Sequence, residues 1–288
     1  MNFYTAAVLL GLAYSAMALG IFLSLRIFRI PDITTDGSFT LGGAVTAVLL
    51  SHFSLNPFLA LPVVIIAGAL TGIATGVIHT QLKIHPLLAG IIVMTGLYSI
   101  SLGIMGRSNI PLISTGSIFG AIPFAGSLNQ WMVLSGFAVI LITLLVFVLK
   151  TDFGIAMRAT GDNEQMAIAS GVNAQRMKIT GLAIANALTS ISGYLVVQYQ
   201  GFTDINMGIG IVISGLAAVI IGESLIRLIK SSNLLFHAVA VVAGSILFRM
   251  ILAMALTSGV NPNYLKLITA LIVLAVVALT GFIKEEKK

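Results

Sequence analysis

The sequence predicts an all-α fold: a polytopic bundle of about nine membrane-spanning helices, within a range of about 8 to 10. The chain is 58% hydrophobic and only 8% charged, and its mean hydropathy is +1.09, values that a soluble globule of this length does not reach. Apolar windows of about 20 residues recur to the end, without the alternating short strands of a β-barrel. Residues 1–288 therefore read as a single transmembrane domain in a cell membrane.

Nine apolar segments predict the individual helices. We place them at residues 3–25, 38–52, 57–80, 86–105, 131–149, 177–200, 208–226, 233–256 and 264–283. The first has no basic region before it and no small-residue cleavage site after it, so it is a retained helix rather than a signal peptide. Gly68, Gly72 and Gly76 recur at helical spacing and allow a neighbouring helix to approach closely.

The basic residues predict the orientation of the bundle. With nine spans, twelve of the 15 lysines and arginines share one face. The positive-inside rule makes this face cytoplasmic, with the N-terminus outside and the C-terminus in the cytoplasm. The twelve are Arg26, Arg29, Lys83, Lys150, Arg158, Arg176, Lys178, Arg227, Lys230, Lys284, Lys287 and Lys288. The net charge of +6 thus reflects membrane orientation and gives no reason to expect a nucleic-acid partner.

A polar, glycine-rich stretch at residues 31–43 precedes the short second span. Such a start is typical of a discontinuous or re-entrant helix whose freed backbone groups face protein or a water-filled cavity. Asp36 can cap this helix, with Thr35 or Ser38 sharing the role. Two interpretations stay open: Asp32 and Asp36 are interfacial caps, or they contact a transported solute.

A second aspartate motif gives a faint internal echo of this stretch. Asp32-Ile33 precedes Gly43 at the interval by which Asp204-Ile205 precedes Gly215. The two starts fall on opposite faces in the predicted topology, as in an inverted repeat flanking a transport pathway. Three identities are equally compatible with chance.

Charged residues inside spans are costly in lipid and need partners. Glu223 and Arg227 have the spacing of an ion pair within one helix, and Arg249 either snorkels outward or sits at a dimer axis. The four histidines lie at span ends without metal-ligand spacing, and the chain has no cysteine. We therefore expect no metal site. No Gly-x-x-x-x-Gly-Lys-Ser/Thr phosphate loop occurs either, so we expect no ATP site of that type in this chain.

The segment 150–178 is a polar island between long apolar runs, with seven charged residues. Its apolar residues recur at near-helical spacing, which predicts two short amphipathic helices broken at Gly161. Asp162 and Asn163 can cap the second helix, and Gly171 can end it. A short helix beneath a membrane bundle is a docking surface for a soluble protein, although an ordinary solvated loop is the alternative.

The island carries a family resemblance. The run Phe153-Gly154-Ile155-Ala156-Met157-Arg158-Ala159, followed by Asn163, Ala167, Ala169 and Gly171-Val172-Asn173, resembles the cytoplasmic coupling loop of ABC importer permeases of the branched-chain amino acid and ribose type. Wider importer families carry a Glu-Ala-Ala, three residues, Gly pattern in this loop. Here Ala167 and Gly171 keep the interval, whereas Gln165-Met166 stands in place of Glu-Ala. The polar stretch at 31–43 is similar to its equivalent in these permeases.

The resemblance implies a transport subunit rather than an enzyme, which binds no cofactor itself because a separate ATPase binds the ATP. Implied partners are ATPase subunits at the cytoplasmic face, an extracellular or periplasmic substrate-binding lipoprotein, and a second permease subunit, with a homodimer favoured. The implied cargo is a small solute, with an amino acid favoured and an aromatic amino acid as one option. The connection 107–130, with Thr203, Asp204 and Asn206, is the expected place for the binding protein.

Two sets of site residues follow from this resemblance. The expected ATPase-coupling residues are Arg158, Gly161, Asp162, Asn163, Glu164, Gln165, Ala167 and Gly171. The candidates for the solute pathway are Thr35, Asp36, Ser38 and Asp204.

Two other function classes remain as alternatives. An ion- or proton-coupled secondary transporter would use Asp36, Asp204 or Glu223. An intramembrane enzyme fits less well, because no paired intramembrane histidine, aspartate or serine constellation stands out.

Overall fold

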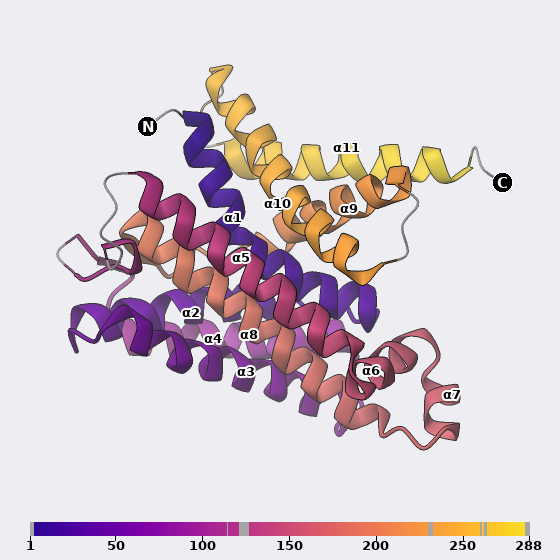
Figure 1. Cartoon of the computed structure of the whole chain (residues 1–288). Coiled ribbons are helices and arrows are strands. Elements are labelled where there is room, and N and C mark those ends of the chain that lie inside the picture. Colours follow the sequence, from indigo (N-terminus) through magenta and orange to yellow (C-terminus); the bar gives the residue numbers. More distant parts are fainter. Residues whose placement is uncertain are drawn as a thin grey trace.

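The computed structural model of the protein describes residues 3–113, 115–120, 127–229, 233–259, 261 and 264–285, which are mostly helical (Figure 1). The order of the elements is α1 Phe3–Ile21, the π-helical turn η1 Phe22–Ile27, α2 Thr34–Ser51, α3 Pro57–Thr80, α4 Pro86–Met105, β1 Asn109–Pro111, the 3-10 turn η2 Ile118–Gly120, α5 Ser127–Lys150, α6 Asp152–Asp162, α7 Glu164–Ala169, α8 Ala174–Gln200, β2 Phe202–Asp204, α9 Ile211–Ile229, α10 Leu234–Thr257 and α11 Leu265–Glu285.

The structure confirms a polytopic helical bundle, and a helix overlies each of the nine predicted segments. Among the described residues, 6 helices are long and apolar enough to cross a membrane. They are Phe3–Ile27, Pro57–Thr80, Pro86–Met105, Leu128–Lys150, Ala174–Gln200 and Leu234–Thr257. The count of nine spans therefore stays a prediction.

The polar stretch at 31–43 does not form a break inside one helix. Residues 28–33 make the turn between η1 and α2, and α2 then runs unbroken to Ser51. The glycines within the stretch serve close packing instead, because a Cβ atom on Gly37 would meet Leu97 of α4 and one on Gly42 would meet the backbone of Ser190 in α8. The predicted interruption thus lies just before α2, and α2 itself is buried over most of its length.

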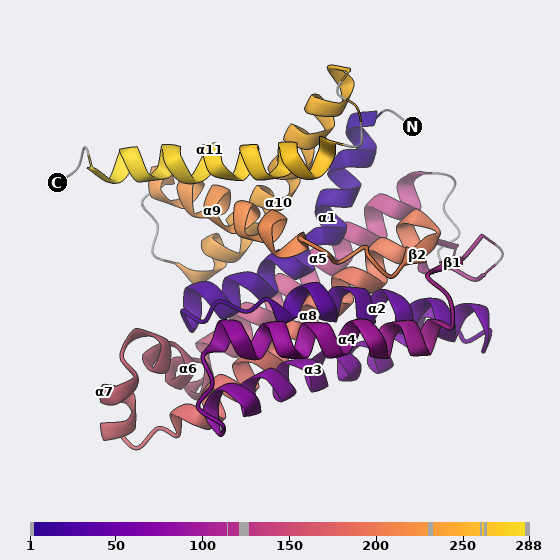
Figure 2. The same cartoon turned by 180° about the vertical axis from the view of Figure 1, so that it is seen from behind.

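Helices α2, α3, α4 and α8 form a closely packed group in one part of the bundle (Figure 2). Gly68, Gly72 and Gly76 line the face of α3 that lies on α8, where added Cβ atoms would overlap Ser190, Leu182 and Ile179. The close approach predicted from their spacing is confirmed.

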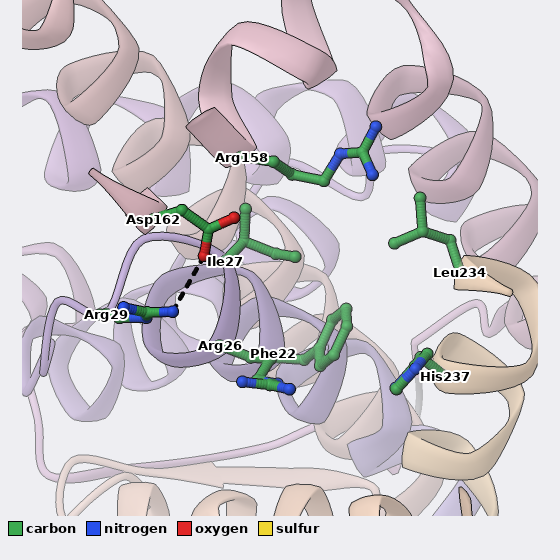
Figure 3. A pocket seen from close by; sticks show the side chains of 8 residues that line it. All are labelled: Phe22, Arg26, Ile27, Arg29, Arg158, Asp162, Leu234 and His237. Carbon is green, nitrogen blue, oxygen red and sulfur yellow. Dashed lines mark hydrogen bonds and ion pairs between the residues drawn. The ribbon is translucent and has the colours of Figure 1, made fainter. Parts of the chain in front are cut away.

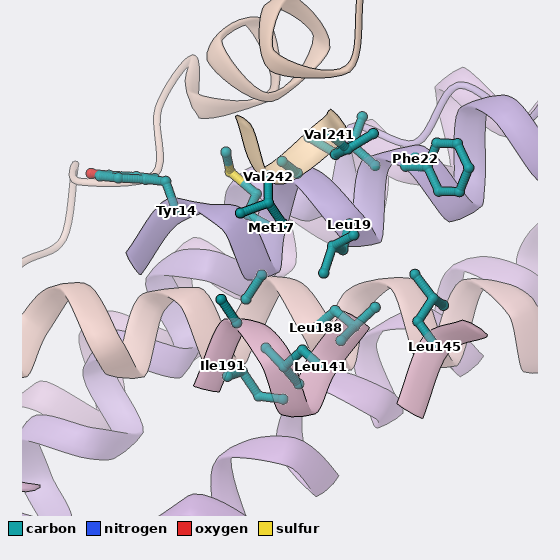
Figure 4. Close-up of a cluster of buried hydrophobic side chains, with 14 of the residues drawn as sticks. Tyr14, Met17, Leu19, Phe22, Leu141, Leu145, Leu188, Ile191, Val241 and Val242 are labelled. Carbon is teal, nitrogen blue, oxygen red and sulfur yellow. The ribbon is translucent and has the colours of Figure 1, made fainter. Parts of the chain in front are cut away.

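The remaining core surrounds α1, which packs against α5, α8, α9 and α10. Met17 and Leu19 of this helix and Phe22 of η1 lie with Leu145 of α5 and Leu188 of α8 in one apolar cluster, all of them buried (Figure 4). The end of α1 is therefore fixed from several sides, and η1 continues it toward the surface.

The two ends of the bundle carry different structures. Helices α6 and α7 project from one end (Figures 1 and 2), which we call the basic end because Arg26, Arg29, Arg158 and Lys178 lie on elements there. At the other end β1 pairs with β2 in an antiparallel ribbon, with Ile110 opposite Thr203, and we call this the ribbon end. The ribbon joins the long connection to residues 203–206, as expected, while residues 114 and 121–126 of that connection lie outside the described residues.

Candidate functional site

Helix α6 is an amphipathic helix that packs back on the bundle. Its first turn is capped by Thr151, whose hydroxyl oxygen accepts the backbone N–H of Gly154 at 3.3 Å, a standard N-cap arrangement. Gly154, Met157 and Thr160 form the buried face, whereas Phe153 and Ile155 are exposed. The periodicity of the island therefore predicted a real helix with one face on the protein.

Helix α7 follows after a single extended residue, Asn163. The side chain of Asn163 accepts the N–H of Met166 at 3.1 Å and so caps α7. At the other end the N–H of Val172 reaches the carbonyl of Ala167 at 3.0 Å, and Gly171 adopts a left-handed φ of 85° that favours glycine. The predicted cap at Asn163 and stop at Gly171 are both confirmed.

The predicted break at Gly161 is wrong, because Gly161 lies inside α6 and the chain turns at Asn163. Gly161 is instead a packing site: a Cβ atom there would overlap the carbonyl oxygen of Ile27 in η1. Asp162 does not cap α7 either. Its carboxylate accepts a hydrogen bond from Nη2 of Arg29 at 2.9 Å, so α6 touches η1 and the turn after it through two neighbouring residues.

The surface of α7 that faces away from the bundle is partly apolar. Met166 is 69% exposed and Ile168 is 55% exposed, and Gln165 is exposed beside them. Ala167 is only 3% exposed and faces the protein's own chain. Ala167 was expected among the ATPase-coupling residues, whereas its neighbours Gln165, Met166 and Ile168 form the outward surface of α7.

An ion pair ties α7 to α8. Nζ of Lys178 lies 2.7 Å from Oε2 of Glu164, and the Lys178 side chain is only 16% exposed. Glu164 is 46% exposed, and ion pairs open to water contribute about 0 to 1 kcal/mol. This contact therefore fixes the position of α7 against α8 more than it adds stability.

Ser38, one of the solute-pathway candidates on α2, belongs to a buried polar cluster that joins α2, α3 and α8. The hydroxyl of Ser38 donates to Oδ1 of Asn186 at 2.6 Å and lies 2.7 Å from the hydroxyl of Thr71. Asn186 in turn donates to Oδ2 of Asp32 at 2.7 Å. Because each buried polar group here has a partner, the cluster fixes the register of three helices.

The turn before α2 is held by Asp32. Its Oδ1 accepts the N–H of Thr34 at 2.9 Å, and the hydroxyl of Thr35 donates to its backbone carbonyl at 3.1 Å. The expectation that Asp36 caps α2 is therefore wrong. Asp32 is also buried within the protein, at 6% exposure.

Asp36 binds the start of another helix. Its two carboxylate oxygens accept the N–H groups of Gly210 at 2.8 Å and of Val212 at 2.9 Å. A carboxylate at a helix start satisfies donors that have no partner within the helix and interacts favourably with its dipole. Asp36 thus links α2 to α9 across the fold.

Asp204 lies apart from this cluster, at the ribbon end. Its Oδ1 accepts the N–H of Asn206 at 2.8 Å, which repeats the local turn that Asp32 makes with Thr34. The echo between the two aspartate motifs therefore extends to the geometry of the two turns.

Charged residues on other elements also contact residues that the sequence did not indicate as partners. Glu223 pairs with Arg26 of η1, whose Nε lies 2.7 Å from Oε1, so the expected pair with Arg227 is wrong. The guanidinium carbon of Arg249 lies 3.5 Å from the centre of the Tyr14 ring, a cation–π contact. This contact borders a cavity of about 290 Å³ between α1, α9, α10 and α11.

Sequence reasoning missed Asn186, the residue that holds the polar cluster together. A signal was present, since an asparagine in the middle of the apolar segment 177–200 is costly in lipid and marks a buried partner. Arg26 and Arg29 gave no comparable signal, because their partners are 133 or more positions away in sequence.

Comparison with known proteins gives consistent similarities. A family model described as "Branched-chain amino acid transport system / permease component" matches residues 3–277. The chain is 39% identical over 268 residues to the tyrosine transport system permease protein of Clostridioides difficile, covering 93% of this chain and 88% of the relative. It is 29% identical to the probable branched-chain amino acid transport permease protein LivH of Methanocaldococcus jannaschii, covering 72% and 69%. It is 30% identical to the ribose import permease protein RbsC of Haemophilus influenzae, covering 66% and 59%. No solved structure matches significantly.

Proposed function

The chain belongs to the family of branched-chain amino acid transport system permease components, which are ABC-type permeases, and from that premise we propose that it imports an amino acid, preferentially an aromatic one. The 39% sequence identity to a tyrosine transport permease supports this cargo. We further propose nine spans, with the N-terminus outside and the C-terminus in the cytoplasm.

The pair α6 and α7 is the proposed docking site for the ATPase, and it is the observation that carries the proposal. Both helices are capped at their N-termini, so they form without a partner protein. The exposed side chains of Gln165, Met166 and Ile168 offer an apolar surface with a hydrogen-bonding group. An exposed apolar patch rimmed by polar residues is typical of a protein interface.

The contacts of α6 supply a route by which the ATPase would act on the bundle. Gly161 packs against Ile27, and Asp162 pairs with Arg29. A displacement of α6 would therefore move η1 and the turn after it. That turn also contains Asp32, which is bonded to α8 through Asn186. Asp36 then joins α2 to the start of α9. ATP binding could shift this network only if the ATPase binds its two arrangements with different affinity.

The solute pathway is proposed to run along α2 and α9. Asp36 and Thr40 border a small cavity of about 30 Å³ together with Tyr98 and Gly208. Thr35 and Ser38 are buried and internally bonded, so their proposed role is to position this wall. Asp204 belongs to the ribbon end, where we propose that a substrate-binding lipoprotein docks and that a second copy of the permease completes the pathway.

A secondary transporter remains the competing function. Asp36 is occupied by two backbone N–H groups, Asp204 by one and Glu223 by Arg26, which argues against a free proton-carrying carboxylate. The test is reconstitution into liposomes with and without the ATPase. We expect tyrosine uptake only with ATPase and ATP, whereas accumulation by the permease alone under a proton gradient would overturn the proposal.

A further inference from the structure

A cavity of about 270 Å³ opens at the basic end between η1, α6 and α10 (Figure 3). It is lined by Phe22, Arg26, Ile27, Arg29, Arg158, Asp162, Leu234 and His237. We propose that this cavity binds the phosphate group of an anionic phospholipid.

The cavity has more positive than negative charge. Three arginines line it against one aspartate. Arg29 is matched by Asp162 at 2.9 Å, and Arg26 by Glu223 at 2.7 Å. Arg158 remains: its Nε is buried and has no hydrogen-bond partner among the described residues. No ion pair among the described residues engages the Arg158 guanidinium, so an anion in the cavity would balance its charge.

The arrangement favours a phosphate group among anions. Guanidinium groups present planar forks of N–H donors that bind phosphate oxygens in pairs. Figure 3 shows Arg158 on one side of the cavity and Arg26 and Arg29 on another, so guanidinium groups from α6 and from the η1 region border the same space. His237 adds a third wall from α10 and can donate a further hydrogen bond.

The position favours a lipid as the source of that phosphate. Phe22, Ile27 and Leu234 form the apolar part of the lining, and Leu235 and Phe236 beside it are 42% and 45% exposed. The cavity therefore lies where the apolar surface of the helices meets the basic end. Basic pockets between membrane helices on the cytoplasmic side are typical binding sites for lipid headgroups.

This assignment gives Arg158 a role other than direct contact with the ATPase. A lipid phosphate held by Arg158 of α6 and His237 of α10 would connect the two elements, because the residues lie on opposite sides of the cavity (Figure 3). The position of α6, and with it the docking surface, would then depend on anionic lipid.

The test is native mass spectrometry of the purified, delipidated protein with dioleoyl phosphatidylglycerol or dioleoyl phosphatidylcholine. We expect the wild type to bind the first phosphatidylglycerol more tightly than phosphatidylcholine. Arg158→Gln should weaken that first binding step roughly tenfold, the loss of a charge-assisted hydrogen bond. Arg176→Gln, which removes an exposed arginine at the same end, should leave it unchanged. Arg158→Lys, which keeps the charge but not the fork, should lie between and serves if Arg158→Gln does not fold.

Four results would overturn the proposal. Equal binding of the two lipids would show that the headgroup charge is irrelevant, and wild-type binding by Arg158→Gln would remove Arg158 from the site. Displacement of the lipid by inorganic phosphate, exchanged for chloride at equal ionic strength, would assign the cavity to the dissolved ion. Loss of ATPase recovery by Arg158→Gln with unchanged lipid binding would assign it to an acidic group of the ATPase.

Discussion

Asn186 in the middle of α8 donates a hydrogen bond to Asp32, 154 positions earlier in the chain, over a distance of 2.7 Å. The same asparagine accepts the hydroxyl of Ser38 at 2.6 Å. One amide therefore fixes the turn before α2 and the first turns of α2 itself. The segment η1 leads from α1 into this turn. The position of the turn therefore affects how motion at the basic end reaches the bundle.

The first prediction concerns this amide. Asn186→Leu should lower the stability of the detergent-solubilised protein by about 3 kcal/mol, because a buried carboxylate loses its donor. Asp32→Asn should cost less, because it removes the buried charge and its amide oxygen can still accept one of the two hydrogen bonds, from Asn186 or from Thr34. Thermal unfolding of the two variants measures the difference, and equal melting temperatures would show that the contact contributes nothing specific.

The second prediction concerns the contact between α2 and α9. Asp36→Ala leaves the N–H groups of Gly210 and Val212 without their acceptor, at a cost of about 1 to 3 kcal/mol each if water does not replace it. We expect reduced solute uptake with unchanged ATPase recovery, since the docking helices are remote. Thr143→Ala, which removes an exposed side-chain hydrogen bond within α5, is the control and should transport nearly normally. Full uptake by Asp36→Ala would mean that the link to α9 is dispensable.

A third prediction separates docking from coupling. Gly161→Ala places a methyl group against the carbonyl of Ile27 and should push α6 away from η1. The variant should still recover the ATPase, because its outward surface is unchanged, but ATP hydrolysis should no longer drive uptake. Gly136→Ala in α5 meets nothing within 4 Å and should behave as wild type. If the two variants import equally well, contact between α6 and η1 is not part of the route.

The elements that depend on local patterns were predictable. The caps of α7 follow from Asn163 and Gly171, and the approach of α3 to α8 follows from glycine spacing, because both depend on a few adjacent residues. The partners of Asp36, Glu223 and Asp162 were not, since each lies far away in sequence and only the packed fold brings it near. The exposed face of α7 was not predictable for a related reason: its sequence does not say which face the bundle covers, and Ala167, an expected coupling residue, is buried.

A fourth prediction tests orientation and uses the absence of cysteine from the sequence. Gln165 and Gly116 are both exposed; Gln165 belongs to α7 at the basic end, and Gly116 follows β1 of the ribbon end. In intact cells a membrane-impermeant maleimide should label Gly116→Cys, whereas Gln165→Cys should react only after permeabilisation. Labelling of both from outside would contradict the proposed arrangement of nine spans.

The central claim is that α7 seats in the ATPase of an importer. Met166, which is 69% exposed, is the position to test, because a single cysteine there should lie at the interface without altering the inward packing of Ala167. Phe53, which is 70% exposed in the turn after α2, provides the matched control.

The decisive measurement is thiol-to-amine crosslinking in membranes that contain the assembled complex. Met166→Cys should give a single adduct with the ATPase subunit, with a yield that changes when ATP is bound, and Phe53→Cys should give none. Absence of the adduct in a complex that retains ATPase and transports, or equal yields from the two positions, would contradict the claim that α7 is the docking element.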